Sequence, residues 1–347
     1  MVLIIKIKRK FGLCCAMLYA LHFLCGSGIS RAPALSAQSA VLVCEGEVLY
    51  EKNARLRLPM ASTTKIMTAI LAIENANTED IVSIKPEHCM VEGSSMYLRP
   101  ESDKTVLELL KGLLLVSGND AALALADHVA GDCDKFVEMM NRKAADLGLE
   151  NTHFTNPHGL SHASHYTTAY DLALLMEYCM DNELFRRIVA MKSFESDGAQ
   201  LLNHNKLLFS CPGCIGGKTG YTEASGRCLV SCCEREGAQV ICVTLSAPDD
   251  WNDHMALYNW VYDNFSLRSL TENQSFPVPL VSNEKSYVFL VPEKEESTFV
   301  RDSSEIRLEA QLPWFAVEPL KAGDRGGKVS IFVDGIKTGE YYLIYSE

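Results

Sequence analysis

The pattern of apolar and polar positions predicts a chain in which short strands enclose a block of helices. Two strands, 39–43 and 48–50, flank a turn and form a predicted hairpin. Apolar residues then recur at helical spacing in five segments, which are residues 62–74, 105–115, 120–130, 134–147 and 168–180. After Gly217 the period shortens, with predicted strands at 228–232 and 240–245 and a closing helix at 251–265. This order favours one antiparallel sheet with helices on its faces.

The sequence pattern becomes strand-like from about residue 268. Four strand-like segments follow, at 287–291, 306–312, 329–333 and 341–345, and Pro, Gly and charged turns separate them. Asp334-Gly335 is a strong hairpin signal. We therefore expect an α/β fold of the α+β kind in two domains. Residues 38–265 would hold the antiparallel sheet and a helical subdomain, and residues 266–347 a small C-terminal β-rich domain.

Residues 1–37 have the pattern of a secretory signal peptide. A basic segment, Lys6–Lys10, precedes the apolar stretch Phe11–Leu24, and small residues with plausible cleavage sites follow at Ala32–Ala34 or Leu35–Ala37. The apolar stretch is short for a helix that crosses about 30 Å of hydrocarbon, although a retained signal anchor remains the alternative. We expect an exported protein whose first 40 residues are not part of the fold.

Charge and cysteine content narrow the choice of function. The net charge of −12 argues against a nucleic-acid partner, which usually requires a basic surface. Of the 13 cysteines, those beyond the signal would meet an oxidising compartment, yet a chain of this length can stabilise its core without disulfides. Cys211-Pro212-Gly213-Cys214 matches a redox C-x-x-C, but no βαβ pattern surrounds it. A local disulfide and two free thiols both stay open.

The first candidate for chemistry is Ser62-Thr63-Thr64-Lys65, at the start of a predicted helix. The i to i+3 spacing places Ser62 and Lys65 on one face, and the helix N-terminus favours negative charge that develops near Ser62. A serine needs an adjacent base to act as a nucleophile. Lys65 can serve if its pKa falls from about 10.4 towards about 7–8. Serine is also a common helix cap, so an N-cap beside a solvated lysine is the alternative.

The second candidate, Ser117-Gly118-Asn119, lies between two predicted helices. Ser117 is suited to relaying a proton, and Asn119 is suited to holding a peptide through its side-chain amide. The same three residues are also typical of an ordinary loop.

The third candidate, Lys218-Thr219-Gly220, starts a predicted strand. The edge of such a strand can bind an extended peptide by main-chain pairing. The charge of Lys218 would lower the pKa of Lys65, Thr219 could bind a carboxylate, and Gly220 would let a backbone approach closely.

Three other apparent motifs are rejected. A second Lys-Thr-Gly, at 337–339, follows the Asp334-Gly335 turn and is interpreted as hairpin sequence. Gly217-Lys218-Thr219 imitates the end of a phosphate-binding loop, but that motif needs glycine where this chain has Pro212. The four histidines between 153 and 165 match no zinc-binding spacing, so no metal site is expected.

With its three motifs in this order, the chain resembles the penicillin-binding serine acyltransferases, and within them the serine-type D-Ala-D-Ala carboxypeptidases. The resemblance covers roughly residues 38–347. The segments that carry it are Gly46–Asn53, Ala61–Met67, Val116–Ala121, Asn151–Leu160, His165–Leu172, Lys218–Thr222 and, in the β-rich domain, Pro319–Gly323. Ala247–Trp251 is similar to Gram-positive members, including those used in sporulation.

The resemblance implies a β-lactamase/transpeptidase-like fold and a reaction without a cofactor. Ser62 would attack the penultimate D-Ala of a peptidoglycan stem peptide while Lys65 accepts its proton. The backbone N–H groups of Ser62 and Tyr221 would form the oxyanion hole. Ser117 would pass a proton to the leaving D-Ala, whose carboxylate Lys218 and Thr219 would hold. Water would hydrolyse the acyl-enzyme, and β-lactams would stall at that stage.

The resemblance also frames the alternatives. Many members end in an amphipathic anchor helix, whereas this sequence ends at Tyr345–Glu347 directly after a predicted strand, so membrane attachment would depend on a retained signal. A β-lactamase would carry a deacylating glutamate before the third motif, and we find none there. A non-catalytic wall-binding protein would have lost Ser62, Lys65 or Lys218. We expect an enzyme at the cell wall or the outer face of the cytoplasmic membrane.

Overall fold

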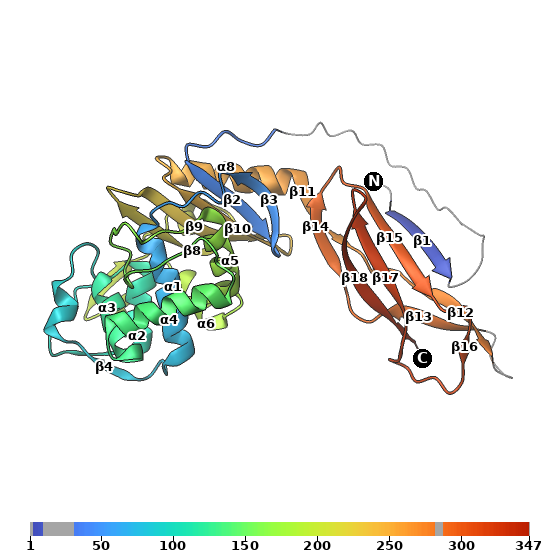
Figure 1. The fold of residues 1–347 in the computed structure, drawn as a ribbon, viewed down its shortest axis with the longest axis horizontal. Coiled ribbons are helices and arrows are strands. Elements are labelled where there is room, and N and C mark those ends of the chain that lie inside the picture. Colours follow the sequence, from blue (N-terminus) through green and yellow to red (C-terminus); the bar gives the residue numbers. More distant parts are fainter. Residues whose placement is uncertain (1–2, 10–30, 282–286, 347) are drawn as a thin grey trace. The chain divides into compact units, whose positions relative to one another are not determined.

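The computed structural model describes residues 3–9, 31–281 and 287–346, which form two compact units (Figure 1). One unit comprises residues 31–263. The other comprises the chain from Asn264 onward together with the N-terminal strand β1 (Leu3–Arg9). Among the described residues, no helix combines the length and the apolar character that crossing a bilayer requires.

A five-stranded antiparallel sheet forms the centre of the first unit, in the order β3-β2-β10-β9-β8. Its strands are β2 (Ser39–Cys44), β3 (Glu47–Lys52), β8 (Cys214–Thr222), β9 (Gly226–Arg235) and β10 (Ala238–Leu245). Segments from the two ends of the unit therefore lie side by side, as the sequence predicts. The predicted α+β fold class is confirmed.

The helices cover both faces of this sheet (Figure 1). They are α1 (Lys65–Asn75), α2 (Val106–Leu115), α3 (Asn119–Ala130), α4 (Cys133–Asp146), α5 (Ala169–Met180), α6 (Glu183–Val189), the short α7 (Leu207–Ser210) and α8 (Asp250–Asn264). On the α8 side, Ser231 Oγ lies 2.7 Å from both His254 Nδ1 and Tyr258 Oη. On the other side, Val230 and Ile241 join the core formed with the remaining helices. Residues on both faces of β2 and β10 are buried, which explains why these two strands are apolar almost throughout.

Short elements complete the first unit. They are the 3₁₀ turns η1 (Ala61–Thr64) and η2 (Pro86–Met90), the pair β4 (Ile81–Ser83) and β5 (Asp103–Thr105), and the pair β6 (Ser193–Ser196) and β7 (Ala199–Leu202). The predicted helix at 62–74 differs in its first turn, since the α-helix begins only at Lys65. The hydroxyls of Thr63 and Thr64 bond to the carbonyls of Met60 and Ala61, at 2.6 and 2.8 Å. Such bonds compete with α-helical geometry and favour the tighter turn.

The second unit is built from strands, and its core is separate from that of the first. A sheet with the order β1-β15-β17-β18-β13-β12-β16 is accompanied by the pair β11-β14. The bounds are β11 (Phe265–Ser269), β12 (Phe276–Val281), β13 (Tyr287–Pro292), β14 (Ser297–Arg301), β15 (Ile306–Leu312), β16 (Ala316–Val317), β17 (Arg325–Val333) and β18 (Ile336–Tyr345). Asp334 and Gly335, with φ of 49° and 84°, form the predicted turn between β17 and β18.

The N-terminal segment differs from the expectation that the first 40 residues stay outside the fold. Strand β1 pairs in parallel with β15, whose edge would otherwise present unpaired backbone groups. The Asp253 carboxylate accepts the N–H groups of Ser36 and Ala37, both at 2.9 Å, and buries Ala37. The apolar stretch 11–24 lies outside the described residues, so the signal peptide stays a prediction.

Candidate active site

The structure brings Ser62 and Lys65 into contact at the junction of η1 and α1. Lys65 Nζ lies 2.8 Å from Ser62 Oγ, 2.7 Å from Asn119 Oδ1 and 2.6 Å from the carbonyl oxygen of His158. Three acceptors from three different segments therefore fix the position of the amine. The sequence identified Ser62, Lys65 and Asn119, but a backbone carbonyl such as that of His158 leaves no signal in a motif.

Burial lowers the pKa of Lys65 and so favours its neutral form. Lys65 has no exposed surface, and its pKa is lowered well below the ordinary value, first by burial and then by the positive charge of Lys218, while Asp120 opposes the shift. A buried ammonium loses hydration that a neutral amine scarcely needs. The alternative of an N-cap serine beside a solvated lysine is wrong, because Lys65 is buried and η1 has no side-chain cap.

Close backbone packing holds η1 in place. A side chain at Gly159 would place its Cβ 2.0 Å from the Ala61 carbonyl oxygen, and the φ of Gly159 is +94°. A Cβ on Gly220 would lie 3.0 Å from the Ser62 backbone nitrogen. These two glycines let the loop before α5 and strand β8 approach the turn from two directions.

The turn that holds Ser117 and Asn119 connects α2 and α3, and Ser117 has a φ of +64°. Asp120, which the sequence did not single out, anchors this turn to the loop that contains Ser95. Its carboxylate accepts the Ser95 hydroxyl at 2.6 Å and the backbone N–H groups of Met96 and Leu98 at 3.1 and 3.0 Å. An aspartate in the first turn of a helix looks like ordinary helix chemistry in sequence, so this anchoring role was missed.

Strand β8 presents Lys218 to Ser117. Lys218 Nζ lies 3.0 Å from Ser117 Oγ and donates to the carbonyl of Thr219 at 2.8 Å. Burial lowers the pKa of Lys218 to about 7. Lys218 therefore points into the protein beside Ser117, and its amine is already bonded there.

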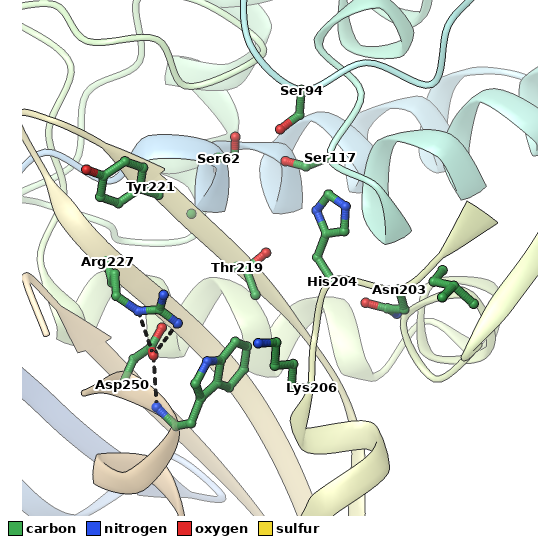
Figure 2. Close-up of a pocket in the computed structure, with 13 residues that line it drawn as sticks. Ser62, Ser94, Ser117, Asn203, His204, Lys206, Thr219, Tyr221, Arg227 and Asp250 are labelled. Atoms are coloured by element: carbon green, nitrogen blue, oxygen red, sulfur yellow. Dashed lines mark hydrogen bonds and ion pairs between the residues drawn. The ribbon is translucent and has the colours of Figure 1, made fainter. Parts of the chain in front are cut away.

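A cavity of about 500 Å³ opens over these groups (Figure 2). Of the predicted site residues, its lining includes Ser62, Ser117, Thr219, Gly220 and Tyr221. The lining residues that the sequence did not place in the site are Ser94, Leu202, Asn203, His204, Lys206, Arg227, Asp250 and Trp251. Figure 2 shows the hydroxyls of Ser62, Ser94 and Ser117 gathered on one side of the cavity.

Arg227 supplies positive charge on another side of this cavity (Figure 2). Its Nε and Nη2 donate to a single carboxylate oxygen of Asp250, at 2.9 and 2.7 Å. The guanidinium also stacks over Trp251, with its Cζ 5.5 Å from the ring centroid. Two contacts from α8 thus hold a cation that strand β9 places opposite Tyr221 of β8.

The four histidines between residues 153 and 165 lie in the loop before α5, and two of them make contacts that hold the loop in place. His165 Nε2 lies 2.7 Å from Thr64 Oγ1, and its Nδ1 accepts the N–H of Thr155 at 3.0 Å. His153 Nδ1 lies 2.7 Å from the Ser164 carbonyl. Among the described residues, no group of three or more His, Cys, Asp or Glu side chains is placed to hold a metal ion.

Comparison with known proteins agrees with this geometry. Residues 28–249 match the peptidase family S11, D-alanyl-D-alanine carboxypeptidase. The D-alanyl-D-alanine carboxypeptidase DacF of Bacillus subtilis is 30% identical over 319 residues, which cover 86% of this chain and 82% of DacF.

Two solved structures extend the likeness. Penicillin-binding protein 5 of Haemophilus influenzae is 27% identical with a TM-score of 0.75, over 92% of this chain and 98% of that one. A D-alanyl-D-alanine carboxypeptidase of Mycobacterium tuberculosis is 33% identical with a TM-score of 0.65, over 68% of this chain and 95% of that one. The resemblance inferred from the three motifs is confirmed, and the chain belongs to the D-alanyl-D-alanine carboxypeptidase family of serine peptidases.

Proposed function

We propose that this protein is a serine D-Ala-D-Ala carboxypeptidase that removes the terminal D-Ala from peptidoglycan stem pentapeptides. The observation that carries the proposal is the buried Lys65 amine, 2.8 Å from the Ser62 hydroxyl. A neutral amine at hydrogen-bond distance is the base that a serine nucleophile requires.

Acylation follows from this pair. As Ser62 Oγ attacks the carbonyl of the penultimate D-Ala, its proton moves to Lys65 Nζ. The close approach of Gly220 to the Ser62 nitrogen puts the N–H groups of Ser62 and Tyr221 near one another, so we assign both to the oxyanion hole. Donors fixed before the reaction stabilise the developing charge without reorganisation. The proton then reaches the leaving amine through Ser117, which lies beside Lys218.

The carboxylate of the leaving D-Ala needs a cation and a hydroxyl. Lys218 is bonded inside the protein, so its charge acts from behind Ser117. We assign direct carboxylate binding to the Thr219 hydroxyl and to Arg227, both of which line the cavity. The sequence predicted that Asn119 holds the peptide through its amide. In the structure its Oδ1 accepts from Lys65 at 2.7 Å and its Nδ2 donates to the Glu92 carbonyl at 2.5 Å, so we assign Asn119 to positioning Lys65.

Water then hydrolyses the ester and regenerates Ser62. With a peptide, the small D-Ala departs and leaves room for water. With a β-lactam, the leaving group stays tethered to the acyl fragment. Among the described lining residues the one carboxylate is Asp250, and one of its oxygens accepts two hydrogen bonds from Arg227. We therefore infer that β-lactams acylate the enzyme and persist as inhibitors.

The substrate determines where the enzyme works. Peptidoglycan lies outside the cytoplasmic membrane, and the predicted signal peptide at residues 1–37 supports export to that compartment. A role in cell wall biogenesis and cell shape follows from the substrate.

One preparation of the mature protein tests the proposal. D-Ala release from a diacylated peptide ending in D-Ala-D-Ala is measured beside hydrolysis of penicillin. We expect repeated turnover of the peptide and a stable penicilloyl-enzyme. Rapid multiple turnover of penicillin with little D-Ala released would instead make the protein a β-lactamase.

A further inference from the structure

Three thiols gather where strand β8 begins. Cys211 and Cys214 are the ends of a tight turn, in which the Cys214 N–H donates to the Cys211 carbonyl at 3.1 Å and Gly213 has a φ of +80°. Across the sheet, Cys233 of β9 is the register partner of Cys214. All three thiols are free, and the intervening Pro212 and Gly213 are exposed.

Cys233, rather than Cys214, shares a hydrogen-bond acceptor with Cys211. The Cys211 and Cys233 thiols both lie near the Pro212 carbonyl oxygen, at 3.8 and 3.5 Å. The Cys214 sulfur has other partners, the Gly216 carbonyl at 3.7 Å and Asn205 Nδ2 at 4.0 Å. The shared acceptor therefore sets Cys211 beside Cys233, a pair that the C-x-x-C spacing does not indicate.

A guanidinium distinguishes Cys211 from its neighbours. Arg235 Nε donates to the Pro212 carbonyl at 2.9 Å, which places its Nη2 3.7 Å from Cys211 Sγ. The hydrogen bond from Cys233 and the charge of Arg235 lower the pKa of Cys211, whereas burial raises the pKa of Cys214 to about 11. The thiolate is the reactive form of cysteine, so Cys211 is the attacking group in the cluster.

We propose that Cys211 and Cys233 form a redox-active pair, which becomes a disulfide by exchange with a small-molecule or protein disulfide. The Cys211 thiolate attacks one sulfur of the external disulfide, forms a mixed disulfide and expels a thiolate, which takes up the Cys233 proton. The Cys233 sulfur then attacks the Cys211 sulfur and expels the second thiolate, which is protonated from solvent. The protein loses two electrons and two protons, and one external disulfide becomes two thiols.

The bond would brace the strand that carries Lys218. It closes a loop from residue 211 to residue 233, which contains all of β8 and its turn into β9. A cross-link of this kind restricts the unfolded chain, so oxidation is expected to raise Tm by about 5 °C. Oxidation would thereby stabilise β8 without placing a new group in the cavity.

Peptide mapping separates the two pairings. The protein is incubated with glutathione disulfide, alkylated with N-ethylmaleimide and digested with trypsin. Cleavage at lysine and arginine puts Cys211 and Cys214 together on peptide 207–218 and Cys233 together with Cys228 and Cys232 on peptide 228–235, where fragmentation of the joined peptides assigns the bonded sulfur. A Cys211–Cys233 bond joins the two peptides, whereas a Cys211–Cys214 bond stays within one.

Matched variants in the exposed turn make the test decisive without altering buried Cys233. We expect the cross-link and the rise in Tm in the wild type and in Cys214→Ser, and neither in Cys211→Ser. Penicillin labelling of all three proteins verifies that each is folded. A bond within peptide 207–218, a cross-link that survives Cys211→Ser, or full alkylation of every thiol after oxidation would overturn the proposal.

Discussion

The same tripeptide, Lys-Thr-Gly, occurs in both units of this protein and meets opposite surroundings. In β8, Lys218 is 1% exposed and its Nζ contacts Ser117. In β18, Lys337 is exposed, with 48% of its side chain accessible, and donates to Glu340 at 2.7 Å. A buried amine beside another lysine acquires a shifted pKa, whereas an exposed ion pair contributes little. The same tripeptide therefore has different chemistry in the two units, because its burial and its neighbours differ.

Replacing the proposed base should have the largest effect on activity. Lys65→Arg keeps a cation in place, but a guanidinium stays protonated and cannot accept the Ser62 proton. We expect D-Ala release to fall by about 10³-fold or more. Steady-state release from a D-Ala-D-Ala peptide measures this, and an Arg variant within tenfold of the wild type would refute the base role.

Removal of the buried Lys-Thr-Gly lysine should have the next largest effect. Lys218→Ala takes the charge from behind Ser117, and we expect kcat/KM for peptide to fall by about 10²-fold. The matched control is Lys337→Ala in β18. Equal losses of kcat/KM in the two variants would show that the two tripeptides do not differ in function.

Arg227 sharpens the comparison because it lines the cavity over β8, the strand that carries the buried tripeptide. A hydrogen bond to a charged group contributes about 1.5–3 kcal/mol, so Arg227→Gln should lower kcat/KM for the free acid by about 10- to 100-fold. A substrate amidated at its C-terminus supplies the control. If Arg227→Gln impairs turnover of the acid and the amide equally, Arg227 does not bind the carboxylate.

The pH profile should shift in a direction that the charges determine. Lys65 must be neutral to act as a base, so activity is lost as pH falls through its pKa. Burial and the charge of Lys218 lower that pKa, and Lys218→Met removes the second cause. The pKa of Lys65 should then rise, and the acidic limb of the penicillin acylation rate should move to higher pH. Lys337→Met should leave the limb in place, and a limb unmoved in both variants would exclude coupling between Lys65 and Lys218.

The smallest effect is expected at the exposed tripeptide. Lys337→Ala removes one of two lysines that bond to Glu340, since Lys328 also reaches it at 3.1 Å. Surface substitutions of this kind are usually mild, so peptide turnover should stay within about twofold of the wild type. A loss comparable with that of Lys218→Ala would show that the tripeptide in the β-rich unit contributes to catalysis.

The sequence could predict features that depend on regular spacing between residues close together in the chain. Periodicity located the long helices of the first unit, most of its central sheet and four strands of the second unit, but not α6, α7, β4 to β7, β11, β12, β14 or β16. The spacing of Ser62 and Lys65 anticipated their contact. It missed the 3₁₀ geometry of η1, because the side-chain bonds of Thr63 and Thr64 that favour this turn depend on local folding. Strand β1 was missed because its pairing depends on the distant β15.

The missed site residues share a physical reason. Arg227 and Asp250 are 23 positions apart and meet only when β9 packs against α8. The His158 carbonyl reaches Lys65 across 93 positions through backbone that any residue could supply. Cys211 and Cys233 share the Pro212 carbonyl because the turn before β8 lies against β9. Contacts of this kind arise from tertiary packing and have no fixed spacing to detect.

The identity of the acylated residue is the most direct test of the account. The mature protein is incubated with a labelled penicillin and digested, and the modified peptide is sequenced, with Ser62→Ala as the control. We predict one label on Ser62 of the wild type, and neither label nor D-Ala release in Ser62→Ala. A label on any other serine, or a Ser62→Ala variant that still releases D-Ala, would contradict the assignment of Ser62 as the nucleophile.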